Sequence, residues 1–143
     1  MWVHCHGQLL TSDRLLKWGI SVDPICSLCQ QCPKTKEHLF IECSFTSQIW
    51  ARILAWIQRD SYSYTCWEQY LDWAVSCAKG KSQRAVVFKI VFAETVYAIW
   101  VERNLRVFEK RFRDGDSIAR EVAYVSNVRA PVGVKQMLQS CVF

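Results

Sequence analysis

The chain has 143 residues, a formal net charge of +5 and 51% hydrophobic residues. This length suits one domain with a real core, and the composition excludes an intrinsically disordered chain. The positive charge weakly favours anionic partners such as RNA or DNA. Residues 1–7 lack the pattern of a secretory signal, so we expect an intracellular protein, nuclear or cytoplasmic and not secreted. Its 8 cysteines therefore indicate metal ligands or free thiols rather than disulfides.

A short helix is expected near the N-terminus, followed by a break. Residues 9–18 are rich in leucine and lead to Gly19, a residue type that commonly follows a helix end. Pro24 then interrupts the chain, because proline lacks an N–H group and disfavours helix in the residue before it. A turn over residues 26–29 is predicted after this break.

Four side chains with metal-binding chemistry follow within one short segment. They are Cys26, Cys29, His38 and Cys43. A Cys-x2-Cys turn lets two thiolates converge on one ion, and Cys3His is a common tetrahedral set in structural zinc sites. Four protein ligands leave no open position for a catalytic water. We therefore expect a structural Zn2+ ion here.

Other interpretations of these residues stay open. Free cysteines are also small core residues, and the histidine can be an ordinary polar side chain. Cys32 and the Pro33 after it extend the start of a bacterial iron–sulfur run, but Lys36 stands where that run has its fourth cysteine. A further cluster consists of His4, Cys5 and His6. Only an extended segment would bring its two histidines together.

The spacing of the last two ligands limits the local structure. Thr35 is the expected N-cap of a helix over residues 36–42. His38 and Cys43 are five residues apart, about 140° around a regular helix, so both cannot face one ion from such a helix. We therefore expect the helix to loosen or end at Cys43.

Two amphipathic helices are expected in the middle of the chain. Ser44 is predicted to cap the first, which has an apolar stripe at helical spacing. The stripe consists of Phe45, Ile49, Ile53, Trp56 and Ile57. A linker over residues 60–65 leads to a second helix over residues 67–78, and residues 79–82 form a turn. The apolar positions of the second helix are Trp67, Tyr70, Leu71, Ala74 and Val75.

Residues 83–112 are expected to form one long helix, or two. Val101, Leu105, Phe108 and Phe112 share one apolar face of it. Residues 85–101 are strongly apolar, but Lys89 and Glu94 within them would each cost roughly 2.5–3.5 kcal/mol in a bilayer. We therefore expect a core helix and no membrane partner.

The C-terminal part is predicted to hold one more amphipathic helix. Residues 114–116 close the long helix, and Ser117 is expected to cap the next one. Its aligned apolar residues are Ile118, Val122, Val125 and Val128. Pro131 ends this helix, and we expect a flexible tail unless Met137, Leu138 and Phe143 dock on the core. The predicted fold class is mainly α, a small helical domain with a zinc-tied Cys-x2-Cys turn near its N-terminus.

A set of cations marks the end of the long helix. The set is Arg103, Arg106, Lys110 and Arg113, at offsets of three, seven and ten residues that place it along one helix face. One interpretation is a solvated face that complements the helix macrodipole and interacts with Glu102 or Glu109. The other is a stripe that contacts the phosphates of RNA or DNA, with steep salt dependence and little sequence preference.

The sequence shows no pattern for catalysis. It lacks a glycine-rich phosphate loop, a carboxylate trio for two metals and a nucleophile elbow, so we predict that the chain is not an enzyme. Five tryptophans, which could in principle stack on bases, have helical spacing and are mostly expected in the core. They are Trp50, Trp56, Trp67, Trp73 and Trp100.

Several short sequence motifs together resemble those of one protein family. They are Leu10-Thr11-Ser12-Asp13-Arg14-Leu15, Trp18-Gly19-Ile20, Cys26-x2-Cys29, Glu37-His38-Leu39-Phe40, Cys43, Ile49-Trp50 and Ile99-Trp100-Val101-Glu102-Arg103-Asn104. In this order, over residues 2–112, they resemble the reverse-transcriptase zinc-binding domain of plant LINE-type, non-LTR retrotransposons. The resemblance implies that the Cys3His residues are the metal ligands. It also implies an origin downstream of a polymerase domain and a role in holding nucleic acid.

These observations combine into one functional hypothesis. Residues 1–113 are the zinc-binding-like domain, residues 114–130 an amphipathic helix, and residues 131–143 the tail. We expect a non-catalytic zinc-binding module, derived from a retrotransposon reverse-transcriptase polyprotein, that binds RNA or DNA nonspecifically. The alternatives are a zinc-stabilised helical protein–protein interaction domain and an inactive retroelement remnant. The oligomeric state is left open.

Overall fold

The computed structural model describes residues 17, 24–60, 64–141 and 143. Over these ranges the chain is helical and forms no β-sheet, with one isolated bridge between Ile25 and Pro33. The elements are η1 (His38–Glu42), α3 (Ser44–Trp56), α4 (Trp67–Ala78), α5 (Gln83–Asn104), η2 (Leu105–Glu109), α6 (Gly115–Arg129) and α7 (Val132–Ser140). The mainly α fold class is therefore confirmed. The helix predicted over residues 9–18, apart from the helical Lys17, and the cluster at residues 4–6 lie outside the described residues.

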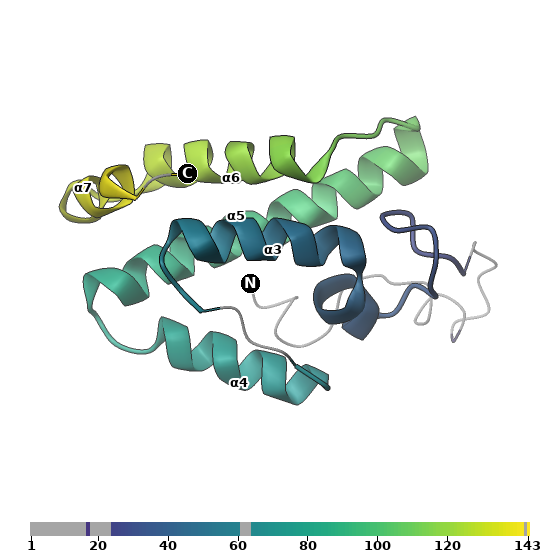
Figure 1. The fold of residues 1–143 in the computed structure, drawn as a ribbon, viewed down its shortest axis with the longest axis horizontal. Helices are drawn as coiled ribbons and strands as arrows, with labels where there is room; N and C mark the ends of the chain where they lie inside the picture. The colour runs from purple at the N-terminus through teal and green to yellow at the C-terminus, as the bar shows by residue number, and fades with distance from the viewer. Residues whose placement is uncertain (1–16, 18–23, 61–63, 142) are drawn as a thin grey trace.

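The long helix α5 organises the fold. Helices α3, α4, α6 and α7 all pack against it, and α3 also packs against α6 (Figure 1). Because α5 is covered on several sides, it is apolar on more than one face. Its largest buried apolar side chains are Phe88, Val91, Phe92 and Ile99. The prediction of a core helix over residues 85–101 is confirmed.

The predicted middle helices are present with their stripes. Ile49 and Ile53 of α3 are fully buried, and Trp50, Trp56 and Trp67 also lie in the core. Helix α4 has the predicted bounds, and Val75, which is 63% exposed, is the exception on its apolar face. The Tyr70 ring contacts the rings of Trp67 and Phe92 and so joins α4 to α5.

The first residue of two helices differs from the prediction. Helix α3 begins at Ser44 itself, so Cys43 is its N-cap, and the carbonyl of Cys43 accepts the Thr46 hydroxyl. Helix α6 is capped by Asp114, whose carboxylate accepts both the N–H and the hydroxyl of Ser117. An aspartate three residues upstream reaches a free N–H of the first turn, which a serine inside that turn does not do.

The predicted apolar face at the end of the long helix is wrong. Phe108 is 78% exposed and Phe112 is 59% exposed, while the buried side of this segment carries Glu102 and Arg106. The helix passes into η2 and stops at Lys110, which has a left-handed backbone with φ 55°. The regular helical spacing on which the prediction depends therefore ends before Phe112.

The C-terminal segment is helical where a flexible tail was expected. Helix α7 follows Pro131, and Leu138 is only 1% exposed. The Trp56 Nε1–H group donates to the carbonyl of Cys141, and the ring of Phe143 contacts the ring of Trp56. The docking named as the exception to a flexible tail is thus observed at Leu138.

Among all the described residues, no helix is long and apolar enough to cross a membrane.

Candidate metal centre

A closed loop places the first two cysteines. The N–H of Cys26 donates to the carbonyl of Cys32 at 2.8 Å, and the N–H of Lys34 donates to the carbonyl of Pro24 at 2.8 Å. Between them, Gln30 has a left-handed backbone with φ 60°, and its N–H donates to the Cys26 carbonyl. The loop therefore turns tightly around the Cys-x2-Cys pair, as predicted for residues 26–29.

A widened helical turn supplies the other two donors. The Thr35 hydroxyl accepts the N–H of His38 at 2.9 Å, which confirms the predicted cap. The segment from His38 to Glu42 then forms η1, a π-type turn, and the N–H of Cys43 donates to the carbonyl of His38 at 2.7 Å. A bond between residues five apart brings both to one side of the turn. The helix thus loosens before Cys43, as the spacing required.

The four predicted donors meet at one point. The sulfur atoms of Cys26, Cys29 and Cys43 and a ring nitrogen of His38 all lie within 4.8 Å of one another. Cys29 Sγ is 3.2 Å from His38 Nε2. Tetrahedral zinc with bonds near 2.3 Å to sulfur needs ligand atoms about 3.8 Å apart, so small side-chain movements suffice. The donor set therefore fits a structural zinc ion.

The electrostatics of the cluster also suit a cation. A hydrogen bond from the buried thiol of Cys43 lowers the pKa of Cys26 to about 4. The backbone N–H groups of Cys29 and Leu28 also lower the pKa of Cys26, whereas burial raises it. The same hydrogen bond and burial raise the pKa of Cys43. A metal ion bonded to both sulfurs would replace this hydrogen bond. His38 Nδ1 is 3.9 Å from the exposed carboxylate of Glu42, which is too far for a hydrogen bond, and this buried nitrogen has no hydrogen-bond partner among the described residues.

Cys32 does not join the four donors. Its side chain is exposed, and it lies outside the cluster. The iron–sulfur interpretation needs Cys32 beside Cys26 and Cys29, so this geometry does not favour it.

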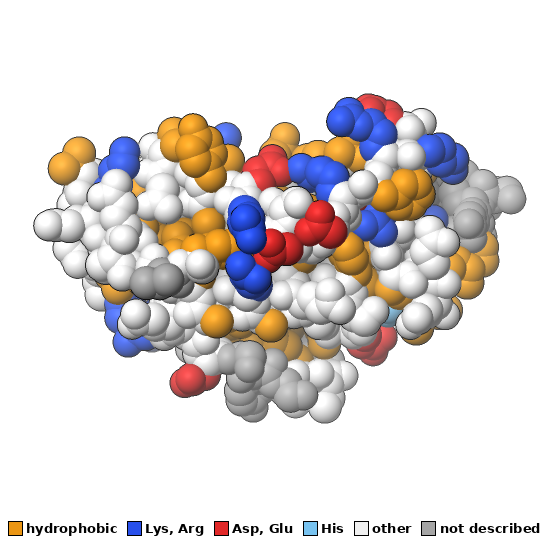
Figure 2. Space-filling model, turned by 45° about the horizontal axis from the view of Figure 1, so that its top comes forward, with side chains coloured by type: hydrophobic (Ala, Val, Ile, Leu, Met, Phe, Trp, Pro, Cys, Tyr) orange, Lys and Arg blue, Asp and Glu red, His pale blue; other side chains and the backbone are white. Residues whose placement is uncertain are grey.

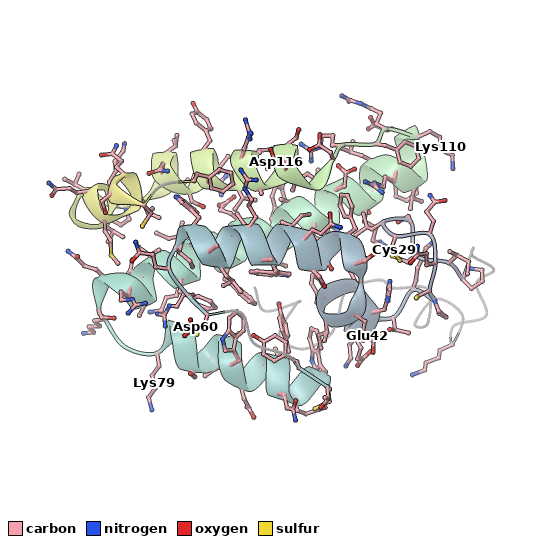
Figure 3. All side chains as sticks on the ribbon, in the orientation of Figure 1. Cys29, Glu42, Asp60, Lys79, Lys110 and Asp116 are labelled. Atoms are coloured by element: carbon pink, nitrogen blue, oxygen red, sulfur yellow. The ribbon has the colours of Figure 1, made fainter. Side chains whose placement is uncertain are left out.

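Arg106 of η2 fixes residues 24–34, which we call the metal-site loop, through hydrogen bonds to its backbone. This role was not predicted from the sequence. The Arg106 guanidinium is 8% exposed and donates to the carbonyls of Ser27 and Leu28, the two residues between Cys26 and Cys29, at 3.3 and 2.8 Å. The loop lies beside the end of α5 (Figures 1 and 3). Fixing both carbonyls limits how the Cys-x2-Cys turn can move. Arg106 is therefore a positioning residue for the metal centre.

A buried carboxylate completes this network. Glu102 is fully buried and accepts Arg106 Nε–H at 2.8 Å, together with Arg113 N–H and Nε–H at 2.9 Å each. Burial raises the pKa of Glu102, but the hydrogen bonds from Arg113 and Arg106 outweigh it, so the pKa is lowered. Arg113 also pairs with Glu121 of α6. The one sequence signal for this network is the spacing of four between Glu102 and Arg106.

The four predicted nucleic-acid residues do not form one exposed stripe. Arg106 and Arg113 are engaged in the Glu102 network, and Arg103 lies over the ring of Trp100 at 4.7 Å. Lys110 is exposed at the end of η2. The face shown in Figure 2 carries blue, red and orange side chains side by side and is not uniformly basic.

Fold and site together define a small helical domain with a Cys3His cluster of metal-binding type. Residues 1–50 of the chain match the family described as zinc-binding in reverse transcriptase. The matched segment contains all four donors and ends within α3, so it covers the first part of the resemblance stated over residues 2–112. No curated protein and no solved structure matches the chain.

Proposed function

We propose that this chain is a non-catalytic, structural zinc-binding module that binds RNA or DNA without sequence preference. The convergence of Cys26, Cys29, His38 and Cys43 within 4.8 Å carries the proposal. Three thiolates and one imidazole select zinc over Mg2+ or Ca2+, which prefer oxygen ligands. Four protein donors complete the coordination sphere of a tetrahedral ion and leave no position for a reacting water.

The proposed origin is the reverse transcriptase of a plant LINE-type retrotransposon. The family match over residues 1–50 supports a reverse-transcriptase zinc-binding segment. The sequence motifs that resemble those of the plant elements, including the Trp100 region of α5, support the assignment to a plant LINE-type element. Binding to nucleic acid is the role that the resemblance implies for such a module, and the net charge of +5 is of the right sign.

The zinc proposal is tested by metal content. The purified chain is expected to carry about one zinc ion per molecule, the ratio of a single four-ligand site. Cys26→Ser and His38→Ala should lose the ion, whereas Cys32→Ser, which changes an exposed cysteine outside the cluster, should keep it. Retention of full zinc by the first two variants would overturn the ligand assignment. Iron in place of zinc would overturn the choice of ion.

The nucleic-acid proposal is tested by salt dependence. A labelled single strand is titrated with the zinc-loaded chain at several salt concentrations, and the logarithm of the binding constant should fall linearly with that of the salt concentration. Strands of different sequence should bind alike. A folded, zinc-loaded chain that binds none of them at low salt would refute this half of the proposal.

A protein-interaction role is the second candidate, and exposed apolar side chains on α5, α6 and α7 favour it. Tyr97 is 63% exposed, Tyr124 71% and Val132 90%. Large apolar side chains that remain in water are available for contact with a partner protein. Under this candidate, substitution of these three residues should abolish binding of a partner protein and leave binding to nucleic acid unchanged.

A further inference from the structure

The end of η2 exposes aromatic and basic side chains together. We call residues 108–112 the aromatic tip. Phe108 and Phe112 are 78% and 59% exposed, and Lys110 and Arg111 between them are also exposed. Figure 2 shows blue and orange side chains close together at this end of the molecule, where Figure 3 labels Lys110. Apolar rings left in water beside cations suit a ligand that has both flat apolar faces and negative charge.

The ring of Phe112 is held in place by a buried charge. Arg106 Cζ lies 5.3 Å from the centroid of the Phe112 ring and 4.3 Å from that of Phe45. The guanidinium cannot move freely, because it donates to the Ser27 and Leu28 carbonyls and to Glu102. One face of the Phe112 ring is therefore covered by a fixed cation, and the exposed remainder faces solvent. Such a ring offers a prearranged stacking surface.

The cations that remain available on the tip are one member of the predicted stripe, Lys110, and its neighbour Arg111, which the prediction did not include. Arg106 and Arg113 are occupied by Glu102 and Glu121. Arg111 makes only an exposed pair with Glu109 at 3.6 Å, and such pairs contribute little, so an incoming phosphate can replace it. Lys110 and Arg111 are thus the cations of this segment that are placed to meet a phosphate.

We propose that the aromatic tip is a stacking site for single-stranded RNA or DNA. Unpaired bases stack on Phe112 and Phe108, and Lys110 and Arg111 contact the phosphates between them. A duplex hides the faces of its bases, so the site selects single strands by the accessibility of those faces and not by sequence. This inference rests on the proposed nucleic-acid function and names its contact surface. It also links that surface to the metal-site loop, because Arg106 contacts both.

The test uses the zinc-loaded full chain and labelled oligonucleotides of about 12 nucleotides, within the usual range for one single-strand site. Single-stranded RNA, single-stranded DNA and a duplex of the same length are compared by fluorescence anisotropy. The doubly substituted chain Phe108→Ala/Phe112→Ala should bind single strands at least about tenfold more weakly. Its zinc content should be unchanged, because both rings are more than half exposed and Arg106 keeps its hydrogen bonds to Glu102 and to the Ser27 and Leu28 carbonyls.

The charged pair is tested separately. Lys110→Ala/Arg111→Ala should lower the salt slope by about 1.4, the value for two phosphate contacts on a single strand. The matched control is Lys79→Ala/Lys81→Ala, which removes two exposed cations from the turn before α5, far from Lys110 (Figure 3). The control should bind single strands within about twofold of the unsubstituted chain, since distant surface charges act weakly through screening salt.

The outcomes separate this inference from the proposed function. If the unsubstituted chain binds single strands and the phenylalanine variant binds equally well, the aromatic tip is overturned while the proposed function stands. Equal weakening by the Lys79 and Lys81 control, or duplex binding as tight as single-strand binding, also overturns stacking at the tip. If the folded, zinc-loaded chain binds no nucleic acid, the proposed function fails and this inference fails with it.

Discussion

The candidate metal centre and the Glu102 network are neighbours, joined by Arg106, and they differ in what balances their buried polar groups. Both bury polar groups, which is costly unless each group is paired. At the candidate metal centre, three cysteine sulfurs and an imidazole nitrogen lie within 4.8 Å of one another, and the cluster itself contains no lysine or arginine. At the network, the carboxylate of Glu102 meets two arginines of the same chain. The first site is suited to a cation from solution, whereas the second carries its own.

This difference predicts how each site responds to change. The metal centre should depend on free zinc, and the network should depend on the protonation and identity of its own residues. Arg106 belongs to both, because it donates to the metal-site loop and to Glu102. Substitutions that touch one site, the other or the link between them therefore test the comparison.

The largest effect is expected from removal of zinc. At a free zinc concentration about 1,000 times the dissociation constant, the ion adds about 4 kcal/mol to the free energy of unfolding, and a chelator should abolish this. Hydrogen exchange should show loss of protection first in residues 26–43, while α5 and α6 keep theirs, since apolar burial holds them. Cys43→Ser should reproduce the chelated state, and Cys32→Ser should not. Equal exposure of α5 would show that the two regions do not unfold separately.

The next largest effect is expected at the buried carboxylate. Glu102→Gln leaves Arg106 and Arg113 without their counter-charge, and breaking a buried pair costs about 3 kcal/mol. Denaturant unfolding of the zinc-loaded protein measures the loss. Glu109→Gln is the matched control, because that carboxylate makes only an exposed pair with Arg111 and should change stability by less than about 0.5 kcal/mol. Similar losses in both variants would contradict a special role for the network.

A smaller effect on stability, with a distinct signature, is expected for Arg106→Lys. The lysine keeps the charge beside Glu102, but its three donors on one nitrogen cannot serve the four acceptors of Arg106, which are three backbone carbonyls and a carboxylate. Zinc affinity should fall about tenfold, as for other outer partners of metal sites, and stability by about 1 kcal/mol. Competition with a chelating dye reports the affinity. Arg111→Lys, at an exposed position, should leave zinc affinity unchanged, and an unchanged affinity in Arg106→Lys would refute its positioning role.

The smallest effect is expected from acid. The pKa of Glu102 is lowered on folding, so its contribution to stability is fully present above the carboxyl pKa of the unfolded chain, about 4.3, and is lost as the pH falls toward the folded value. The difference in unfolding free energy between the unsubstituted chain and Glu102→Gln should therefore shrink below about pH 5. Both chains are measured with a chelator present, so that zinc release does not contribute to the difference. A difference that stays constant down to pH 3 would contradict the lowered pKa.

Local patterns were enough to predict most of the helices and the metal cluster. The apolar stripe of α3, the bounds of α4 and the Thr35 cap depend on residues within a few positions of one another. The same holds for the four donors, whose spacing even requires the widened turn before Cys43. Periodicity, caps and ligand spacing are properties of a short segment, so the amino-acid sequence shows them directly.

Other features depend on contacts between distant parts of the chain. Helical spacing places Phe108 and Phe112 on an apolar face, but the helix stops at Lys110, and the buried side is taken by Glu102 and Arg106. Arg106 joins residues 78 and 79 positions away, and no local pattern distinguishes it from a solvated arginine. Likewise, the segment expected to be a tail forms helix α7, which packs on the core through the buried side chain of Leu138.

The amino-acid sequence by itself therefore determined most of the helices and the four side chains that could hold one ion, because those properties are set by neighbours along the chain. Only the tertiary structure decided which cations stay in water and which hold the metal-site loop. The reason is physical: a charge is buried only where distant segments supply every hydrogen-bond partner it needs.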